Sequence, residues 1–314
     1  MIRGVLLIAF ASLLWATTSI VAKFLFADTD LQPLTLGLVR LLVALPFFWW
    51  LMKQELDRAA DNAGQRKRLW PPLGGRGLLV LASLGLFQAF YQGSYLMAVD
   101  AIGAGIATLI SLCLPPVLVA ILAAPLLGEK PRLVTVIALV AAIAGTGMLV
   151  ASDIETAGSF RLTGILLALL AAAVYTGFNM TSRYNSAGTP VFTTAFVCFL
   201  VAALLLLPPV WLSGGFAGLA SLGLNGWLMV IYIGVVPTCV GYVCFFTGMK
   251  TTPATLASII VTLEPLFVAL LAWLILDEVL GMTGIAGALI LTLAVIVASA
   301  SSRRQPTTPR EETR

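Results

Sequence analysis

Long apolar runs alternate with short polar segments along this 314-residue chain. A run of about 20 apolar residues predicts a helix that crosses the hydrocarbon of a bilayer, because an α-helix rises about 1.5 Å per residue. Connectors such as 100–102 and 251–253 are so short that the helices they join must be antiparallel. The pattern predicts an all-α integral membrane protein with ten transmembrane helices, at residues 4–26, 33–52, 77–98, 103–127, 133–151, 163–183, 191–212, 226–248, 254–276 and 283–300.

The composition supports this interpretation and excludes a soluble globular protein. Hydrophobic residues make up 60% of the chain and charged residues 10%, whereas soluble proteins carry about 25% charged residues. The mean hydropathy is +1.03. Nearly all of the charge lies in the connectors, and one residue departs from this rule. Glu264 is the only charged residue between Ala254 and Leu276.

The distribution of basic residues predicts the orientation in the membrane. If the N-terminus is cytoplasmic, then every Lys and Arg except Lys23, Arg40 and Arg161 falls in a cytoplasmic segment, as the positive-inside rule requires. We therefore expect a multi-pass protein of the bacterial inner (cytoplasmic) membrane with both termini in the cytoplasm. The net charge of +4 reflects this topology and indicates no nucleic-acid partner.

Several kinds of chemistry are absent from the sequence. It has no histidine and no Cys-x-x-Cys pair. These absences exclude a Cys/His metal site and argue against a disulfide framework. It contains no Walker-type phosphate loop and no Gly-x-Ser-x-Gly motif. We expect no catalytic residues, no metal, no cofactor and no direct use of ATP, so a membrane-embedded enzyme is only a remote alternative.

The two halves of the chain resemble each other. Residues 4–24 align without gaps on 164–184, and 114–130 align on 263–279. These matches predict two five-helix repeats at 1–152 and 153–302, followed by a disordered cytoplasmic tail at 303–314. Because five is odd, the two repeats must enter the membrane in opposite directions. Inverted repeats of this kind are typical of secondary transporters that work by alternating access.

Three segments resemble a known family. "LLWATTSIVAKF", "LGLVRLLVALPFF" and "TTPATLASIIVTLEPLFVALLAWLILDE" are similar to the drug/metabolite transporter superfamily, specifically its EamA-type members, over about residues 4–300. The resemblance implies ten helices in two inverted repeats and the export of metabolites such as amino acids. The aromatic amino acid exporters are one branch. Two departures from repeat symmetry matter: the counterpart of Glu264 is Pro115, and span 191–212 has no arginine matching Arg40.

A polar stripe on the third predicted helix indicates the solute site. Its four residues follow helical spacing, so they share one face, and two amides with two phenols do not suit a lipid-facing surface. Matching positions in other helices add further aromatic and polar groups, giving a lining that suits a small amphipathic solute. The alternative is that these side chains only hold helices together. The candidate substrate-binding residues are Trp15, Ser19, Gln88, Tyr91, Gln92, Tyr95, Tyr175, Asn179, Thr238 and Tyr242.

Prolines within predicted helices indicate bends at the same depth. Proline lacks a backbone N–H, so it leaves a carbonyl of the preceding turn without its helical partner. Broken helices mark the binding region of inverted-repeat transporters or supply bends for gating. The predicted helix breaks are Pro115, Pro116, Pro237 and Pro265.

Glu264 and Arg40 are the charges that need an explanation. A charged side chain at the bilayer centre costs roughly 2.5–3.5 kcal/mol on insertion scales, so Glu264 is predicted to face the protein interior. Three roles stay open for it: a proton-coupling or substrate-amine site, a structural acid, or a partner of Arg40. Arg40 either holds a substrate carboxylate or is structural.

The sequence therefore predicts a secondary transporter that exports small metabolites, with amino acids or related amphipathic compounds as the favoured class. A multidrug, vitamin or nucleotide-like solute transporter is the alternative. The expected partners are a small-molecule substrate and the lipid bilayer, the expected state is a monomer or homodimer, and proton coupling stays open.

Overall fold

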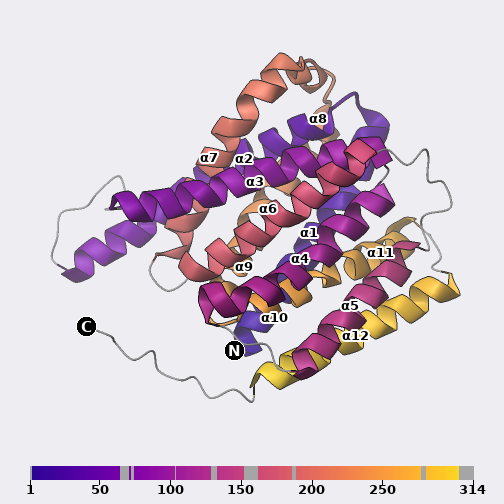
Figure 1. Cartoon of the computed structure of the whole chain (residues 1–314). Helices are drawn as coiled ribbons and strands as arrows, with labels where there is room; N and C mark the ends of the chain where they lie inside the picture. Colours follow the sequence, from indigo (N-terminus) through magenta and orange to yellow (C-terminus); the bar gives the residue numbers. More distant parts are fainter. Residues whose placement is uncertain are drawn as a thin grey trace.

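The computed structural model describes residues 2–63, 71, 74–102, 104–128, 133–151, 162–185, 189–276 and 281–303. These residues form helices and turns, and no strand occurs among them (Figure 1). The helices are α1 (Ile2–Asp28), α2 (Pro33–Ala63), α3 (Gly75–Ile102), α4 (Ala104–Leu127), α5 (Leu133–Ala151), α6 (Leu162–Asn185), α7 (Val191–Leu212), η1 (Gly215–Leu219), α8 (Leu224–Ile233), η2 (Gly234–Val240), α9 (Gly241–Met249), α10 (Ala254–Val261), α11 (Leu263–Leu276) and α12 (Met282–Arg303).

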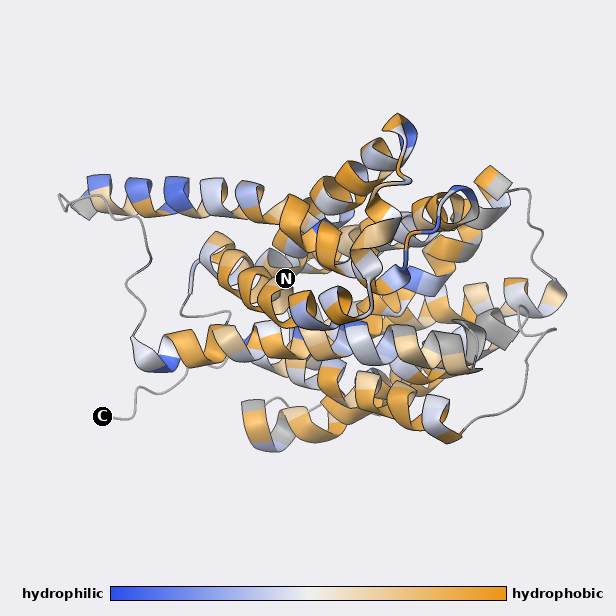
Figure 2. Ribbon diagram, turned by 90° about the horizontal axis from the view of Figure 1, so that it is seen from above, coloured by the Kyte–Doolittle hydropathy of each residue, from blue (hydrophilic) through white to orange (hydrophobic). Residues whose placement is uncertain are grey.

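Six helical stretches among the described residues are long and apolar enough to cross a membrane. Shorter apolar helices run through Ile110–Ala123, Leu133–Met148 and Met282–Ala298. Figure 2 shows hydrophobic residues along most of the helical ribbon, as expected for a protein solvated by acyl chains. The prediction of an all-α membrane protein is confirmed. The six stretches are Ile2–Phe26, Pro33–Asn62, Leu162–Asn185, Val191–Leu212, Leu224–Met249 and Ala254–Ile275.

Two helices extend past their predicted membrane spans because helix formation does not stop where hydropathy falls. The second helix was expected to end at residue 52, but α2 continues to Ala63. Residues 53–63 include three Ala and one each of Leu, Glu, Gln, Lys and Arg, and they contain neither Pro nor Gly, so they favour a helix even in water. In the same way, α12 reaches Arg303, which was assigned to the tail. Residues 304–314 lie outside the described residues.

Backbone irregularities interrupt two of the long helical stretches. Helices α8 and α9 are joined end to end by the π-helix η2, which contains Pro237. A single residue, Thr262, separates α10 from α11. Pro265 lies in the first turn of α11, where the missing N–H has no helical partner to lose. In contrast, α4 runs unbroken through Pro115 and Pro116.

Helices of each half pack mainly on helices of the other half, and the contacts occur in corresponding pairs. Helix α3 packs on α6 as α9 packs on α1, and α4 packs on α6 as α10 and α11 pack on α1. The pairs α2–α7 and α5–α12 also join the halves, and Figure 1 shows α3 beside α6 and α5 beside α12. Phe48 of α2 stacks on Phe199 of α7 with ring centroids 5.1 Å apart. The core therefore lies between the halves.

Candidate functional site

The polar stripe of α3 meets α9 in the interior of the bundle. Gln88 and Gln92 are buried, and Tyr91 and Tyr95 are half-buried. The Nε2 atom of Gln88 donates a hydrogen bond of 2.9 Å to the hydroxyl of Tyr242. A residue of the stripe in the first half thus binds a candidate site residue of the second half.

Aromatic rings from four helices surround this hydrogen bond. The ring of Tyr91 lies 5.7 Å from that of Tyr95 and 4.9 Å from that of Tyr175 on α6. The ring of Trp15 on α1 lies 4.9 Å from that of Tyr242. These centroid separations fall in the range of favourable ring contacts. Together with Gln88, these five aromatic residues form what we call the central cluster.

A glycine allows Trp15 to enter the central cluster. A Cβ atom placed on Gly241 would lie 2.9 Å from Nε1 of Trp15, so only glycine leaves room for the indole at this point of α9. The Nε1 atom is buried and has no hydrogen-bond partner among the described residues. A buried donor without a partner is costly, so this N–H is suited to donate a hydrogen bond to a bound solute.

The remaining predicted site residues lie outside the central cluster, in different environments. Asn179 is fully buried, and its Nδ2 donates to the carbonyl of Tyr175 at 3.0 Å. Its Oδ1 is buried without a partner in the described part of the chain. Thr238 in η2 donates to the carbonyl of Ile233, the last residue of α8, at 2.7 Å. Ser19 is exposed, and the structure does not bring it into the central cluster.

Glu264 sits at a helix end within the bundle. It is half-buried in the first turn of α11, just after the interruption at Thr262. The free N–H groups of a helix N-terminus favour a carboxylate, and the interruption puts Glu264 at such a position. Its carboxyl interacts electrostatically with Tyr91, Tyr175 and Tyr242, which places it beside the central cluster.

Arg40 on α2 is the basic group that acts on the same site. Its guanidinium interacts electrostatically with Glu264 and with Tyr242. No ion pair joins Arg40 to Glu264 in the described part of the chain, and the buried Nε of Arg40 has no hydrogen-bond partner there. The backbone carbonyl of Arg40 also approaches the π-helix, since a Cβ atom on Gly234 would lie 3.1 Å from it.

Sequence reasoning missed the phenylalanines that enclose the central cluster. Phe178 stacks near Tyr175 with centroids 6.2 Å apart, and Phe199 meets Tyr242 edge-on at 4.6 Å. Phe178 follows Tyr175 by three residues, so helical spacing could have identified it. Phe199 lies on α7, and no local pattern connects it with α9.

The donor set does not suit a metal. Among the described residues there is no group of three or more His, Cys, Asp or Glu side chains that could hold an ion. Cys198, Cys239 and Cys244 are free thiols, and the side chain of Cys113 lies outside the described residues. The central cluster instead offers ring faces, amides and hydroxyls, with one acid and one base beside them. These groups are suited to binding a solute.

Comparison with known proteins agrees with this picture. Residues 2–151 and 162–300 each match the EamA-like transporter family. The chain belongs to the EamA-like transporter family. The EamA resemblance noted in the sequence is therefore confirmed, and the two matched segments correspond to two EamA repeats. Family membership indicates a transporter rather than an enzyme.

Relatives of this EamA-like transporter are similar over nearly their whole length. The uncharacterized transporter YwfM of Bacillus subtilis is 29% identical over 305 residues, which is 96% of this chain and 95% of YwfM. The uncharacterized inner membrane transporter YicL of Salmonella typhimurium is 24% identical, covering 96% of this chain and 97% of YicL. These names give no substrate, so the aromatic amino acid branch stays a prediction.

A solved crystal structure of another protein shares the fold of this EamA-like transporter. The two chains superpose with a TM-score of 0.74 at 21% sequence identity, and the match covers 96% of this chain and 99% of the other. At this identity the likeness establishes a common fold and nothing about the solute.

Proposed function

We propose that this EamA-like transporter exports small amphipathic solutes, with amino acids as the favoured class, by alternating access around the central cluster. The observation that carries the proposal is the hydrogen bond from Gln88 to Tyr242, because it joins matching helices of the two halves. A solute bound there contacts both halves at once. Its exposure then changes when the halves exchange their conformations.

The corresponding pairs of helix contacts between the two halves support an inverted ten-span architecture. Every major contact of α3 or α4 with the second half has a counterpart in which the roles of the halves are reversed. The stretch from α8 through η2 to α9 and the pair α10–α11 each take the place of one span. An even number of spans and the predicted charge distribution support a topology with both termini in the cytoplasm, in a bacterial inner membrane.

The chemistry of the central cluster and its neighbours fits a zwitterion that carries an apolar side chain. The guanidinium of Arg40, with an unpartnered Nε, suits a carboxylate. The N–H of Trp15 adds a second donor. Glu264 suits an ammonium group, and the rings of Tyr91, Tyr95 and Tyr175 provide faces for an aromatic or aliphatic group.

Glu264 is proposed to bind either the solute ammonium or a proton, and so to couple the two. Its place in the first turn of α11 supports this role, since a helix terminus holds the carboxylate without requiring a fixed ion pair. A helix interrupted near the centre of the bundle is the arrangement by which many transporters build a solute or ion site.

The proposal is tested by counterflow in proteoliposomes. Vesicles loaded with unlabelled tyrosine, phenylalanine, threonine or cysteine derivatives are placed in a medium with the labelled compound. We expect accumulation of at least one of these solutes, reduced to the level of protein-free vesicles in Arg40→Gln. If none of the four moves in vesicles that contain folded protein, the amino acid class is wrong.

A further inference from the structure

A carboxylate from α2 meets the start of α7 at one end of the bundle. This end holds Ile2, Ala63, Val191 and Met249, and we call it the N-side. The backbone N–H of Thr193 donates a hydrogen bond of 3.4 Å to Oε2 of Glu55. Glu55 lies on the first EamA repeat and Thr193 on the second, so this bond crosses the boundary between the two repeats.

The contact supplies a hydrogen-bond acceptor at the N-terminus of α7, where the sequence of α7 has no capping side chain. The N-cap residue of α7 is Pro190, and the described residues include no side-chain hydrogen bond from that position. The first N–H groups of a helix need acceptors, and a negative charge is favourable there. Glu55 provides both from a different helix, so this hydrogen bond exists only while α2 and α7 stay together on the N-side.

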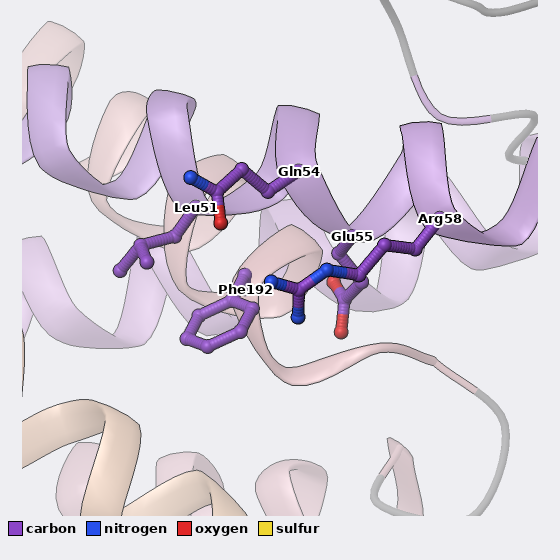
Figure 3. A pocket seen from close by; sticks show the side chains of 5 residues that line it. All are labelled: Leu51, Gln54, Glu55, Arg58 and Phe192. Atoms are coloured by element: carbon purple, nitrogen blue, oxygen red, sulfur yellow. The ribbon is translucent and has the colours of Figure 1, made fainter.

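A cavity beside the contact leaves Glu55 free to move. It has a volume of about 360 Å³ and is lined by Leu51, Gln54, Glu55, Arg58 and Phe192. Figure 3 shows Glu55 and Arg58 projecting from α2 toward the start of α7, where Phe192 lies. Glu55 is half-buried, and its 3.4 Å bond is longer than the usual range of about 2.7–3.2 Å for N–H···O hydrogen bonds, so it is weak. The bond can therefore break and reform at low cost.

Other N-side contacts are tighter and involve α9. Arg183 donates through Nη1 to the carbonyl of Met249 at 2.9 Å and to that of Lys250 at 3.3 Å, which places a cation at the C-terminus of α9. A Cβ atom on Gly248 would lie 2.8 Å from the carbonyl of Gly4. The Arg183 bonds stay within the second repeat, whereas the hydrogen bond between Glu55 and Thr193 joins the two repeats.

We propose that Glu55 is a gating residue whose contact with the N-terminus of α7 holds the N-side closed and breaks when that side opens. The inference rests on the proposed alternating access, because a transporter with one fixed conformation needs no such contact. It assigns no role in solute binding to Glu55. On the predicted topology the N-side is the cytoplasmic side.

The test measures access to a buried residue of α7. Ala195 is fully buried near the start of this helix, and Ala195→Cys changes little volume. The reporter is placed in a chain whose own four cysteines are replaced by serine, and the full-length protein in vesicles is treated with a membrane-impermeant maleimide from either side. We expect Glu55→Gln to raise the labelling rate from the N-side about two- to fivefold, the range expected when a charge is lost from a helix N-terminus. Arg58→Gln, which changes a charge in the same cavity, should leave the rate unchanged.

A second variant keeps the test decisive. Glu55→Asp retains the charge on a shorter side chain, so its labelling rate should lie between those of the parent and Glu55→Gln. If Glu55→Gln fails to fold, an Asp rate above that of the parent supports the gate, and an Asp rate equal to it overturns the gate. Equal rates for the parent, Glu55→Gln and Arg58→Gln also overturn it. No solute is required, so a failed gate and a failed substrate class give different results.

Discussion

The Nε2 atom of Gln88 lies 2.9 Å from the hydroxyl oxygen of Tyr242 and donates a hydrogen bond to it. Both side chains are buried, at 1% and 8% exposure, in helices that occupy corresponding places in the two halves. A buried polar pair of this kind specifies how α3 and α9 are positioned against each other, because neither group finds another partner at low cost when the pair separates.

Removing both partners of this pair should destabilise the protein by less than the sum of the two single removals. Tyr242→Phe leaves the Gln88 amide buried and unsatisfied, which costs about 1–3 kcal/mol. The double variant Gln88→Leu/Tyr242→Phe should lose less than the two single losses summed. Unfolding in detergent, followed for all four proteins, gives the coupling energy. Additive losses would show that the hydrogen bond does not join the two helices.

Gly241 should be intolerant of even one added methyl group. In Gly241→Ala the new Cβ would lie 2.9 Å from Nε1 of Trp15, so the indole must move away from Tyr242. We expect about a tenfold loss of solute affinity, measured by equilibrium binding, since a 1.4 kcal/mol change corresponds to that factor. Gly93→Ala on α3 is the matched control, because no atom lies within 4 Å of its added Cβ. Equal affinities for the two variants would contradict a role for Trp15.

Glu264→Gln separates coupling from structure. Glutamine keeps the shape and the hydrogen-bonding capacity of the side chain at the first turn of α11 but cannot release a proton. If Glu264 couples transport to protons, this variant should fold normally and lose the pH dependence of proteoliposome transport. Tyr91, Tyr175, Tyr242 and Arg40 interact with the same group and stay unchanged. Misfolding of Glu264→Gln, or transport that keeps its pH profile, would favour a structural role.

The α5–α12 pair should depend on Gly145. A Cβ atom there would lie 2.7 Å from the backbone nitrogen of Leu291 and 2.8 Å from the carbonyl oxygen of Gly287. Backbone atoms cannot turn aside as a side chain can, so Gly145→Ala should cost about 1–3 kcal/mol of stability. Thermal unfolding in detergent measures this loss. Gly37→Ala, which meets no atom within 4 Å, should be neutral or slightly stabilising. A loss of the same size at both positions would argue against close backbone packing.

Local patterns predicted the elements and one face of the site. The spacing of Gln88, Tyr91, Gln92 and Tyr95 places them together because they share a helix, whatever the rest of the fold does. Helix ends were less accessible: α2 continues past residue 52 to Ala63 because its polar residues still favour a helix. Hydropathy reports the membrane boundary, and helix propensity reports the helix boundary.

The positions of the prolines did not by themselves predict where the helices are interrupted. Pro115 and Pro116 stay inside an unbroken helix, whereas Pro265 follows an interruption at Thr262. The difference depends on whether neighbouring helices satisfy the freed backbone groups, and a single chain segment does not contain that information. Contacts between distant residues were equally hidden. Glu55 and Thr193 are 138 residues apart, and no local motif links them.

The central claim is that a solute site at the seam of the two halves is exposed to each side of the membrane in turn. Its most direct test is a single cysteine at Tyr95→Cys in the cysteine-free protein, with an impermeant maleimide applied separately to the two sides of oriented vesicles. The account predicts modification from both sides, and protection from both by a transported solute. Modification from one side only, or modification from both sides that no transported solute slows, would contradict it.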